Sequence, residues 1–280
     1  MSKTFNVACV QNCASTDMEH NLAETETWVR EAHSAGADLV CLPENCIFID
    51  VDDGRMVAAA LPEESHPALA RYQALAKELG IWLLAGSMPI RISDDRVNNR
   101  SYLIADDGRI VSRYNKIHLF DVNLKNGESY LESERVKPGE QAVVADTPWG
   151  RLGHSICYDL RFAYLYRALA QAGADFLVVP AAFTQTTGAA HWHVLLRARA
   201  IETGCYVFAP GQGGIHSSGR KTYGHSLIVD PWGTVLADKG PEPGYIIAEI
   251  DPGRVSEARQ MIPALRHDRP FELHGVTSGL

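Results

Sequence analysis

A short motif occurs twice in this chain and limits the folds that it can adopt. AGADLV at residues 35–40 recurs as AGADFL at residues 172–177, an offset of 137 residues. A second pair has a similar offset of 125 residues, since SYLIADDGRIV at 101–111 resembles SLIVDPWGTVL at 226–236. In both members of this pair, two strand-like runs flank a turn that contains Asp and Gly. One such match arises by chance in α/β proteins, but two in the same order predict a chain built from two similar halves.

Apolar runs of strand length alternate with amphipathic segments of helix length, a pattern typical of layered α/β folds. The predicted strands are residues 5–11, 37–43, 81–89, 99–106, 174–183, 205–211 and 225–230. The predicted helices are residues 20–35, 66–79, 162–172 and 191–203. Because the strands are apolar along nearly their whole length, both faces of each should be buried. Together with the repeat, this predicts an α/β fold in which two helix–strand–helix–strand–hairpin units form a four-layer α-β-β-α sandwich with a pseudo-twofold internal repeat.

The length and composition are those of one globular unit. The chain has 280 residues, of which 46% are hydrophobic and 21% charged, close to globular averages, so disordered and coiled-coil structures are disfavoured. No linker rich in proline or serine divides the chain, and we expect a single domain over residues 1–280. The segment from about 253 to 280 is polar. We expect it to form a C-terminal tail that packs on another subunit of a homodimer or higher homo-oligomer.

The net charge limits the classes of molecule that the protein is expected to bind. Asp and Glu outnumber Lys and Arg by 34 to 26, which gives a formal net charge of -8 and argues against binding to nucleic acids or acidic membranes. The first residues lack the apolar core of a secretory signal, and no stretch approaches the roughly 20 apolar residues of a membrane span. The six cysteines form no C-x-x-C pair, so neither a disulfide framework nor a zinc ribbon is predicted. We expect a cytoplasmic protein that acts on a small molecule.

Two charged residues follow predicted strands, where α/β proteins place functional side chains. Glu44 comes directly after the first AGAD strand, in LVCLPENC, and ligand sites of open α/β sheets lie beyond the carboxyl ends of strands. Lys116 ends a hairpin strand in RIVSRYNKIHLFD, and the residues after it are largely apolar. Each has a simpler explanation. Glu44 fits a surface loop or a helix N-terminus, and Lys116 fits a side chain whose stem covers apolar surface while its ammonium reaches solvent.

Cys157 differs from the other cysteines because it lies between a strand and a helix, in HSICYDLRF. Enzymes of the α/β type expose a nucleophile on such a turn, where the next backbone N–H can bind an oxyanion and the start of a helix lowers the pKa of a thiol. A buried structural cysteine is the alternative, and it is what we expect for Cys9, Cys41, Cys46 and Cys205. A thiol, a carboxylate and a cation have complementary roles as nucleophile, base and oxyanion ligand.

The segments around these three residues resemble those of a known family. LPEN at Glu44, YNKIHLFD at Lys116 and HSICYDLRF at Cys157 are similar, in the same order, to the Glu, Lys and Cys motifs of the nitrilase (carbon–nitrogen hydrolase) superfamily. The resemblance extends to about residue 250 and implies an α-β-β-α sandwich that hydrolyses a linear amide through a thioester on Cys157. It makes Glu44 the base, and Lys116 with the Tyr158 N–H the oxyanion ligands. This chemistry requires no cofactor and no metal.

Within the superfamily, the branch of deaminated-glutathione amidases and ω-amidases is the most similar in KIHLFDV, in YLES followed by PGE, and in TGAAHWHVLLRARAIE. The resemblance implies a carboxylate-bearing amide as substrate, with deaminated glutathione as the first candidate. An α-keto ω-amide, an N-carbamoyl compound and a nitrile are the alternatives. It also assigns Glu132, in SYLESERV, to a second glutamate that supports the lysine and the substrate. Without the resemblance, Glu132 is one acid in an acidic loop.

Five further residues are candidates for the substrate pocket. They are Tyr158, Phe183, Thr184, His191 and Trp192. His191 and Trp192 begin the predicted helix at 191–203, and backbone N–H groups at its start would attract a substrate carboxylate. Capping of that helix explains the same two residues equally well.

Other histidines and arginines are expected to be structural. His118 and His154 lie near the lysine and the cysteine and suggest a Cys–His dyad. However, strand alternation turns His154 away from the cysteine, and no papain-type or caspase-type signature is present. Arg161 is expected to form an ion pair within the fold, and Arg199 one with Glu202 at i,i+3.

Two other classes of function are disfavoured. A binding protein on the same fold would be expected to lack one of the three reactive residues, and all three are present. A thiol-redox protein would use Cys157 with a resolving cysteine, and no C-x-x-C pair exists. The sequence therefore favours a hydrolase.

Overall fold

The computed structural model describes residues 4–50, 53–123, 129–272 and 274–275. The first half consists of β1 (Phe5–Gln11), α1 (Met18–Ser34), β2 (Leu39–Cys41), α2 (Asp53–Ala59), α3 (Pro67–Leu79), β3 (Trp82–Leu84), β4 (Met88–Arg91), β5 (Val97–Ile104) and β6 (Ile110–Asn115). A small hairpin of β7 (Asp121–Asn123) and β8 (Ser129–Leu131) follows. The second half consists of β9 (Val144–Thr147), β10 (Gly150–His154), α4 (Ala163–Gln171), β11 (Phe176–Val178), α5 (Gln185–Thr203), β12 (Tyr206–Ala209), β13 (Gly213–Ile215), β14 (Lys221–Tyr223), β15 (Leu227–Val229) and β16 (Val235–Asp238). The last elements are β17 (Gly244–Ile250) and α6 (Gly253–Met261).

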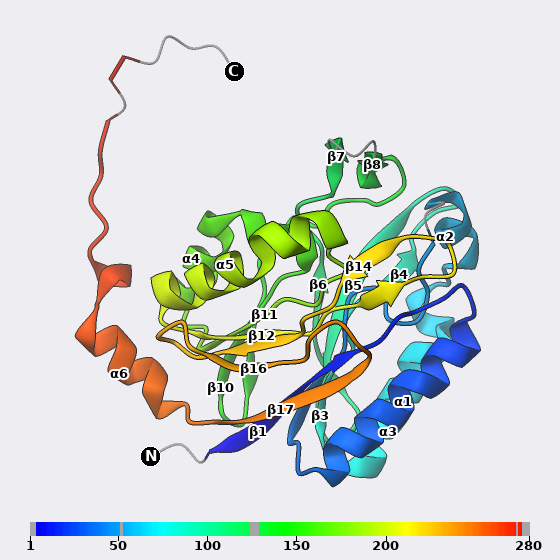
Figure 1. Ribbon diagram of the computed structural model, residues 1–280, viewed down its shortest axis with the longest axis horizontal. Helices are drawn as coiled ribbons and strands as arrows, with labels where there is room; N and C mark the ends of the chain where they lie inside the picture. Colours follow the sequence, from blue (N-terminus) through cyan, green and yellow to red (C-terminus); the bar gives the residue numbers. More distant parts are fainter. Residues whose placement is uncertain (1–3, 51–52, 124–128, 273, 276–280) are drawn as a thin grey trace.

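The two halves form two sheets with corresponding strand orders (Figure 1). The first sheet has the order β17-β1-β2-β3-β5-β4 with β6 paired to β5, and the second has the order β16-β15-β12-β11-β10-β9. In each half, three parallel strands, β1-β2-β3 or β10-β11-β12, are followed by an antiparallel hairpin, β5-β6 or β15-β16. The two AGAD motifs directly precede β2 and β11, so the predicted sandwich with an internal repeat is confirmed.

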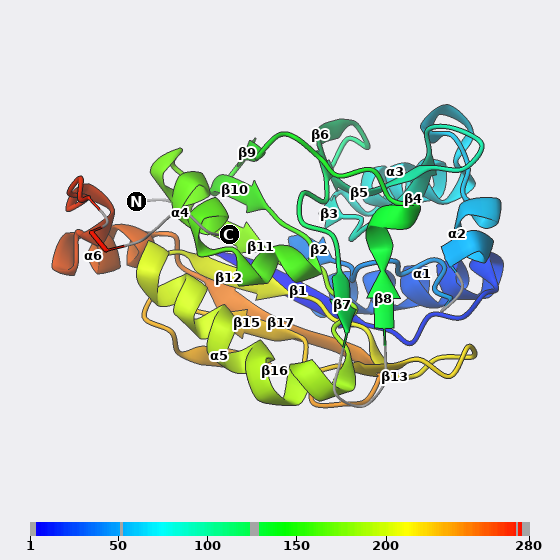
Figure 2. The ribbon, with the colours of Figure 1, turned by 90° about the horizontal axis from the view of Figure 1, so that it is seen from above.

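Because side chains point alternately to the two faces of each sheet, the hydrophobic core is divided into three layers, one between the sheets and one under each pair of helices. Helices α1 and α3 cover the outer face of the first sheet, and α4 and α5 cover that of the second (Figures 1 and 2). Along β1, Ala8 and Val10 belong to the core under the first pair of helices, whereas Val7 and Cys9 belong to the core between the sheets. Leu177 of β11 packs under the second pair in the same way. Burial on both faces is the physical reason for the continuous apolar runs, and each fully buried large side chain contributes roughly 1.5–3 kcal/mol.

One predicted strand is divided. The strand predicted at 81–89 forms two shorter strands, β3 and β4, with Gly86 between them. Gly86 has φ +46°, and a Cβ there would lie 2.0 Å from the carbonyl oxygen of Pro43. The chain therefore turns at the one residue without a side chain, so that β4 pairs with β5 instead of extending β3.

Helix α5 begins earlier than predicted, at Gln185 instead of residue 191. Thr184 is its N-cap, and its hydroxyl accepts a hydrogen bond from the Thr187 N–H at 3.4 Å. The polar run FTQTTG looks like a loop, but its threonines satisfy the free N–H groups of a helix start. His191 and Trp192 therefore lie in the second turn and do not open the helix.

The segment predicted as a polar tail begins with helix α6. Val255 and Ala258 are buried, and Arg259 donates to the carbonyls of Ala174 and Thr203. With so few apolar contacts, this helix leaves only a weak periodic signal in the sequence. After α6, a short 3-10 helix (Ala264–Arg266) returns to α4, where Arg167 donates to the Ala264 carbonyl at 3.0 Å and Gln171 donates to Asp268 at 2.6 Å. The described residues beyond Asp268 extend away from the sandwich (Figure 1). None of the described helices combines the length and apolar character needed to cross a membrane.

Candidate active site

A cavity lies beyond the carboxyl ends of β2, β10 and β11. The segments after these strands contribute Glu44, Cys157 and Ala182, and Lys116 enters from the end of β6. The residues that line the cavity are Glu44, Asn45, Ile49, Asp50, Met56, Lys116, Phe120, Tyr130, Glu132, Cys157, Tyr158, Ala182, Phe183, Thr184, Thr187 and Arg220. Both halves of the repeat therefore build one site.

The Lys116 ammonium lies between two carboxylates. Its Nζ is 2.9 Å from Oε1 of Glu44, and 3.0 and 2.9 Å from the two oxygens of Glu132. The lysine side chain is 2% exposed, and those of Glu44 and Glu132 are 4% and 14% exposed. The Phe120 N–H donates to Glu132 at 2.6 Å, which holds the second glutamate in place. The sequence alternative of a lysine that reaches into solvent is thus wrong.

Glu44 is held on both oxygens. The Asn99 side chain donates to Oε1 at 2.9 Å, and the backbone N–H of Ala182 donates to Oε2 at 2.9 Å. Asn99 comes from β5 of the first half, and Ala182 follows β11 of the second half. The carboxylate therefore has a fixed orientation in the cavity that the Cys157 thiol also lines.

Cys157 lies on a sharp turn at the start of a short 3-10 helix, Cys157–Arg161. Its φ is +47°, an unfavourable left-handed conformation for a residue with a side chain. The turn is held by Asp159, whose carboxylate accepts from the Ile156 N–H at 2.9 Å and from the Tyr114 hydroxyl at 2.6 Å. The Cys157 N–H donates to the carbonyl of Pro180 at 2.9 Å. These contacts offset the strain and aim the thiol into the cavity.

Burial and charge set the protonation states. Burial favours a higher pKa for Glu44, but the Lys116 ammonium opposes it, and the pKa lies below the ordinary value of 4.5. Burial would lower the pKa of Lys116, but Glu132 and Glu44 raise it well above its ordinary value. Burial, and then the Glu44 charge, raise the pKa of Cys157 well above its ordinary value. The expectation that the helix start lowers the pKa of this thiol is therefore wrong.

At neutral pH the site therefore combines an ionised carboxylate, an ammonium and a protonated thiol. This is the arrangement that general-base activation of a thiol requires, because the base is already charged and lies in the same cavity as the thiol whose proton it removes. The adjacent ammonium can stabilise negative charge that develops on a carbonyl oxygen.

Three of the five predicted pocket residues line the cavity, namely Tyr158, Phe183 and Thr184. His191 is exposed on α5, with its Nδ1 3.3 Å from the Arg161 guanidinium, and it does not line the cavity. Trp192 is buried behind Phe183, with ring centroids 5.0 Å apart. Both assignments relied on a helix that started at residue 191. The earlier start of α5 moves both side chains away from the cavity.

The other histidines and arginines are mostly structural, as expected. Ser112 Oγ is 2.8 Å from the buried Nε2 of His154, and Asp159 binds the N–H and the ring of His118, so neither histidine contacts the thiol. Arg199 pairs with Glu202 at 2.8 Å.

Arg161 differs from its prediction, because its described contacts include no ion pair. Its guanidinium lies over the rings of Tyr158 and Phe183, 5.8 and 5.3 Å from their centroids. Two aromatic pocket residues thus take the place of the expected carboxylate.

The second cation of the cavity, Arg220, was not among the residues expected from the sequence. It follows Gly219 in a polar hairpin between β13 and β14, and nothing in SSGRKTY distinguishes it from a surface arginine. Its Nη2 donates to the carbonyl of Ala182 at 3.0 Å, and its guanidinium lies 5.3 Å from the centroid of the Tyr130 ring. Its Nε is buried and has no hydrogen-bond partner in the described part of the chain.

Comparison with known proteins agrees with this geometry. Residues 6–260 match the family model described as "Carbon-nitrogen hydrolase". The chain is 43% identical over 270 residues to a deaminated glutathione amidase of Synechocystis sp., covering 95% of this chain and 98% of that protein.

Solved structures show the same fold. Nit3 of Saccharomyces cerevisiae, a member of branch 10 of the nitrilase superfamily, superposes with a TM-score of 0.85 at 31% identity, covering 95% of this chain and 97% of Nit3. A mutant form of an amidase from Nesterenkonia sp. AN1 carries the acetamide moiety of fluoroacetamide covalently on its active site cysteine. It superposes with a TM-score of 0.79 at 26% identity, covering 92% of this chain and 94% of that one.

Proposed function

The chain belongs to the carbon–nitrogen hydrolase family, and on this premise we propose that it hydrolyses deaminated glutathione through a thioester on Cys157. The observation that carries the mechanism is that Glu44 and Lys116, joined by a hydrogen bond, share one cavity with Cys157, with Glu132 behind the lysine. The 43% identity to a protein named deaminated glutathione amidase supports the choice of substrate.

In the acylation half, Glu44 removes the thiol proton as the sulfur attacks the amide carbon. The oxygen of the tetrahedral intermediate gains negative charge, which Lys116 and the backbone N–H of Tyr158 stabilise. The carbon–nitrogen bond then breaks, and Glu44 passes its proton to the leaving nitrogen. The products of this half are the free amine, cysteinylglycine, and a thioester on Cys157.

In the deacylation half, water occupies the space that the amine leaves. Glu44 takes a proton from this water, and the resulting hydroxide attacks the thioester carbon. The carbon–sulfur bond breaks, the carboxylic acid leaves, and the proton on Glu44 returns to the sulfur. Because Glu44 ends each half as a carboxylate, one residue serves as base and acid in both.

The substrate bears carboxylates, and the residues at the reaction centre do not balance that charge. Glu44 and Glu132 carry two negative charges against the one positive charge of Lys116. Arg220 is the additional cation on the cavity wall, and its Nε donor is buried without a partner among the described residues. We assign Arg220 the role of binding a substrate carboxylate, because a buried guanidinium donor gains most from a charged acceptor.

The proposal extends to the domain organisation, the assembly and the cellular compartment of the protein. We propose that residues 1–280 form one domain and that the chain assembles as a homodimer or higher homo-oligomer. The exposed apolar residues Met261, Ile262 and Phe271 at the C-terminal end would be covered in such an assembly. We place the protein in the cytoplasm, where its free cysteines would stay reduced.

The proposal is tested by kcat/KM on a panel of amides. We expect deaminated glutathione to be preferred over α-ketoglutaramate and over a neutral aliphatic amide, with the carboxylic acid and the amine released in equal amounts. A preference for α-ketoglutaramate would make the protein an ω-amidase with the same mechanism. Faster turnover of the neutral amide, a nitrile or an N-carbamoyl amino acid would refute the substrate and leave the thiol chemistry intact.

A further inference from the structure

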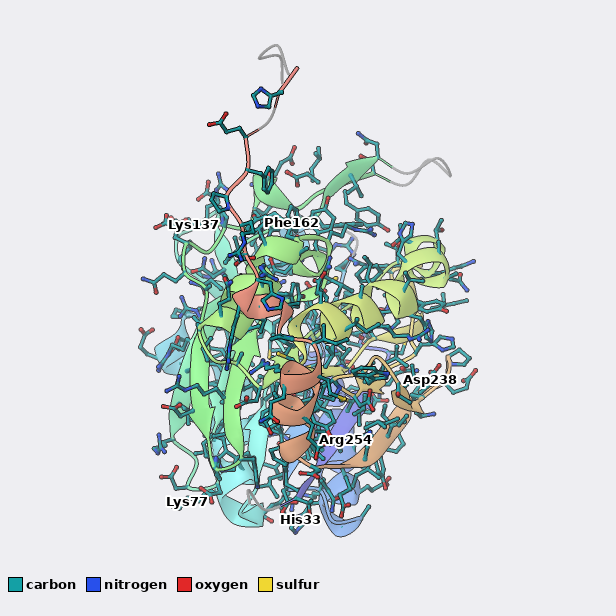
Figure 3. All side chains as sticks on the ribbon, turned by 90° about the vertical axis from the view of Figure 1, so that its left-hand side faces the viewer. His33, Lys77, Lys137, Phe162, Asp238 and Arg254 are labelled. Atoms are coloured by element: carbon teal, nitrogen blue, oxygen red, sulfur yellow. The ribbon has the colours of Figure 1, made fainter. Side chains whose placement is uncertain are left out.

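Two histidines and one aspartate meet on the outer side of the second half, outside the cavity. His193 comes from α5, His225 from the turn before β15, and Asp238 from the end of β16. Their side chains are 33%, 25% and 34% exposed, so ions in solvent can reach them. Figure 3 shows Asp238 at the periphery of the molecule.

The donor atoms converge. Nε2 of His193 is 3.0 Å from Oδ2 of Asp238, and Nδ1 of His225 is 2.9 Å from Oδ1 of the same carboxylate. One ligand atom from each of the three residues lies within 4.8 Å of the other two. Ligands of tetrahedral zinc, at bonds of about 2.0–2.1 Å, are roughly 3.3 Å apart, so small side-chain rotations suffice to bring these atoms around one ion.

The backbone and neighbouring rings hold these side chains in place. His225 has φ +53°, and its backbone N–H donates to the carbonyl of Gly240 while its own carbonyl accepts from the indole of Trp192, both at 2.8 Å. The Gly240 N–H also donates to Asp238 at 2.8 Å. The ring of Tyr223 stacks on His225 with centroids 4.4 Å apart. Such supporting contacts orient ligands and strengthen metal sites.

We propose that His193, His225 and Asp238 form a binding site for one divalent transition-metal ion, and that Zn²⁺ is the ion that it fits. Two imidazole nitrogens and one carboxylate are ligands that zinc prefers, whereas Mg²⁺ and Ca²⁺ favour sites built from oxygen alone. Three protein ligands leave a fourth position for water. Without metal, N–H groups of the two imidazoles donate to the carboxylate oxygens. When the ion binds, these protons leave and the nitrogen lone pairs bind the metal together with the carboxylate.

The site would fasten α5 to the hairpin of β15 and β16. The N-cap of α5, Thr184, and its first-turn residue Thr187 line the cavity, so the metal would stabilise an element that also shapes the pocket. No step of amide hydrolysis passes through it. No metal was expected from the sequence because the three ligands lie 32 and 13 positions apart, which is no zinc-ligand spacing.

The test is direct measurement of Zn²⁺ binding to the full chain by calorimetry, with thermal unfolding as a second readout. We expect one Zn²⁺ per chain with Kd at or below about micromolar, and a Tm that rises on adding Zn²⁺. His193→Gln and Asp238→Asn should each weaken binding at least tenfold and remove the rise in Tm. His193 is on a helix surface, so His193→Gln is expected to fold. It can therefore test the proposal even if Asp238→Asn does not fold.

Two control variants separate this site from other zinc ligands. His20→Gln, on α1, and Cys157→Ala, in the cavity, should bind Zn²⁺ as the wild type does. The proposal is overturned if no Zn²⁺ binds at tens of micromolar, if the His193 and Asp238 variants bind like the wild type, or if Cys157→Ala abolishes binding.

Discussion

Glu44 contacts Lys116 through one carboxylate oxygen, at 2.9 Å from Nζ, and leaves its other oxygen to the Ala182 N–H. This contact joins the two residues of the first half of the chain that the reaction uses. Because the ammonium is so close, the carboxylate stays ionised in a buried site, and the thiol of Cys157 stays protonated until Glu44 removes its proton.

Cys157→Ala is expected to abolish hydrolysis and leave the fold intact. The side chain lies at a cavity wall, so its loss removes the nucleophile and few packing contacts. Intact mass spectrometry of the wild type with a slow amide should show an acyl adduct that maps to the peptide with Cys157. Cys13→Ala is the matched control, because Cys13 is half-buried and outside the cavity, and it should keep activity and adduct. Activity that survives in Cys157→Ala would disprove the mechanism.

Glu44→Gln and Lys116→Ala are each expected to lower kcat at least about a hundredfold, the typical effect of losing a general base or an oxyanion donor. Arginine at position 116 should rescue little, since a planar guanidinium does not place a point charge between two carboxylates. Glu78→Gln, an exposed surface variant, should match the wild type. A change in KM alone would mean that Glu44 and Lys116 only bind the substrate.

Arg220→Met is expected to raise KM for the carboxylate-bearing substrate at least about tenfold, because a charged hydrogen bond is lost, while turnover of a neutral amide stays nearly unchanged. Arg220→Lys should recover part of the loss, since the charge remains. The exposed neighbour Lys221→Met is the control for a change in net charge. Equal losses on charged and neutral amides would show that Arg220 shapes the pocket and does not recognise a carboxylate.

Acid should destabilise the protein through buried His154. Burial lowers its pKa from 6.5 to about 4, so between these values the unfolded chain binds a proton that the folded chain does not. The free energy of unfolding therefore falls as pH drops from about 6.5 to 4, by about 3 kcal/mol for this residue. Denaturant unfolding at several pH values measures this loss.

The His154→Gln variant keeps an amide near Ser112 and should show a shallower loss of stability with acid. It should not remove the loss entirely, because burial also lowers the pKa of His66 to about 4. His33→Gln, on the last turn of α1, is the control and should follow the wild type. If the free energy of unfolding falls with pH equally in the wild type and in His154→Gln, His154 is not a cause of the acid sensitivity.

Much of the fold follows from the sequence alone. Alternation along strands such as β1 places neighbouring residues in different cores, so a strand buried on both faces must be apolar throughout. The AGAD repeats mark where each half begins the middle one of its three parallel strands. Glu44, Lys116 and Cys157 could be selected because each lies at or just after the end of a strand, a property of local sequence, and because the segments around them resemble the motifs of the family. The start of α5 was missed because capping threonines look like loop residues.

Only the tertiary structure decides which of these residues touch. Glu44 and Lys116 are 72 positions apart, and the pairing of β2, β3, β5 and β6 within the first sheet brings them within hydrogen-bonding distance. Arg220 and the cluster of His193, His225 and Asp238 carry no local signal, because each residue alone resembles an ordinary surface side chain. Strand alternation and turn chemistry act over a few residues and can be predicted from sequence. Protonation states and binding sites depend on distances and burial that exist only after the layers have packed.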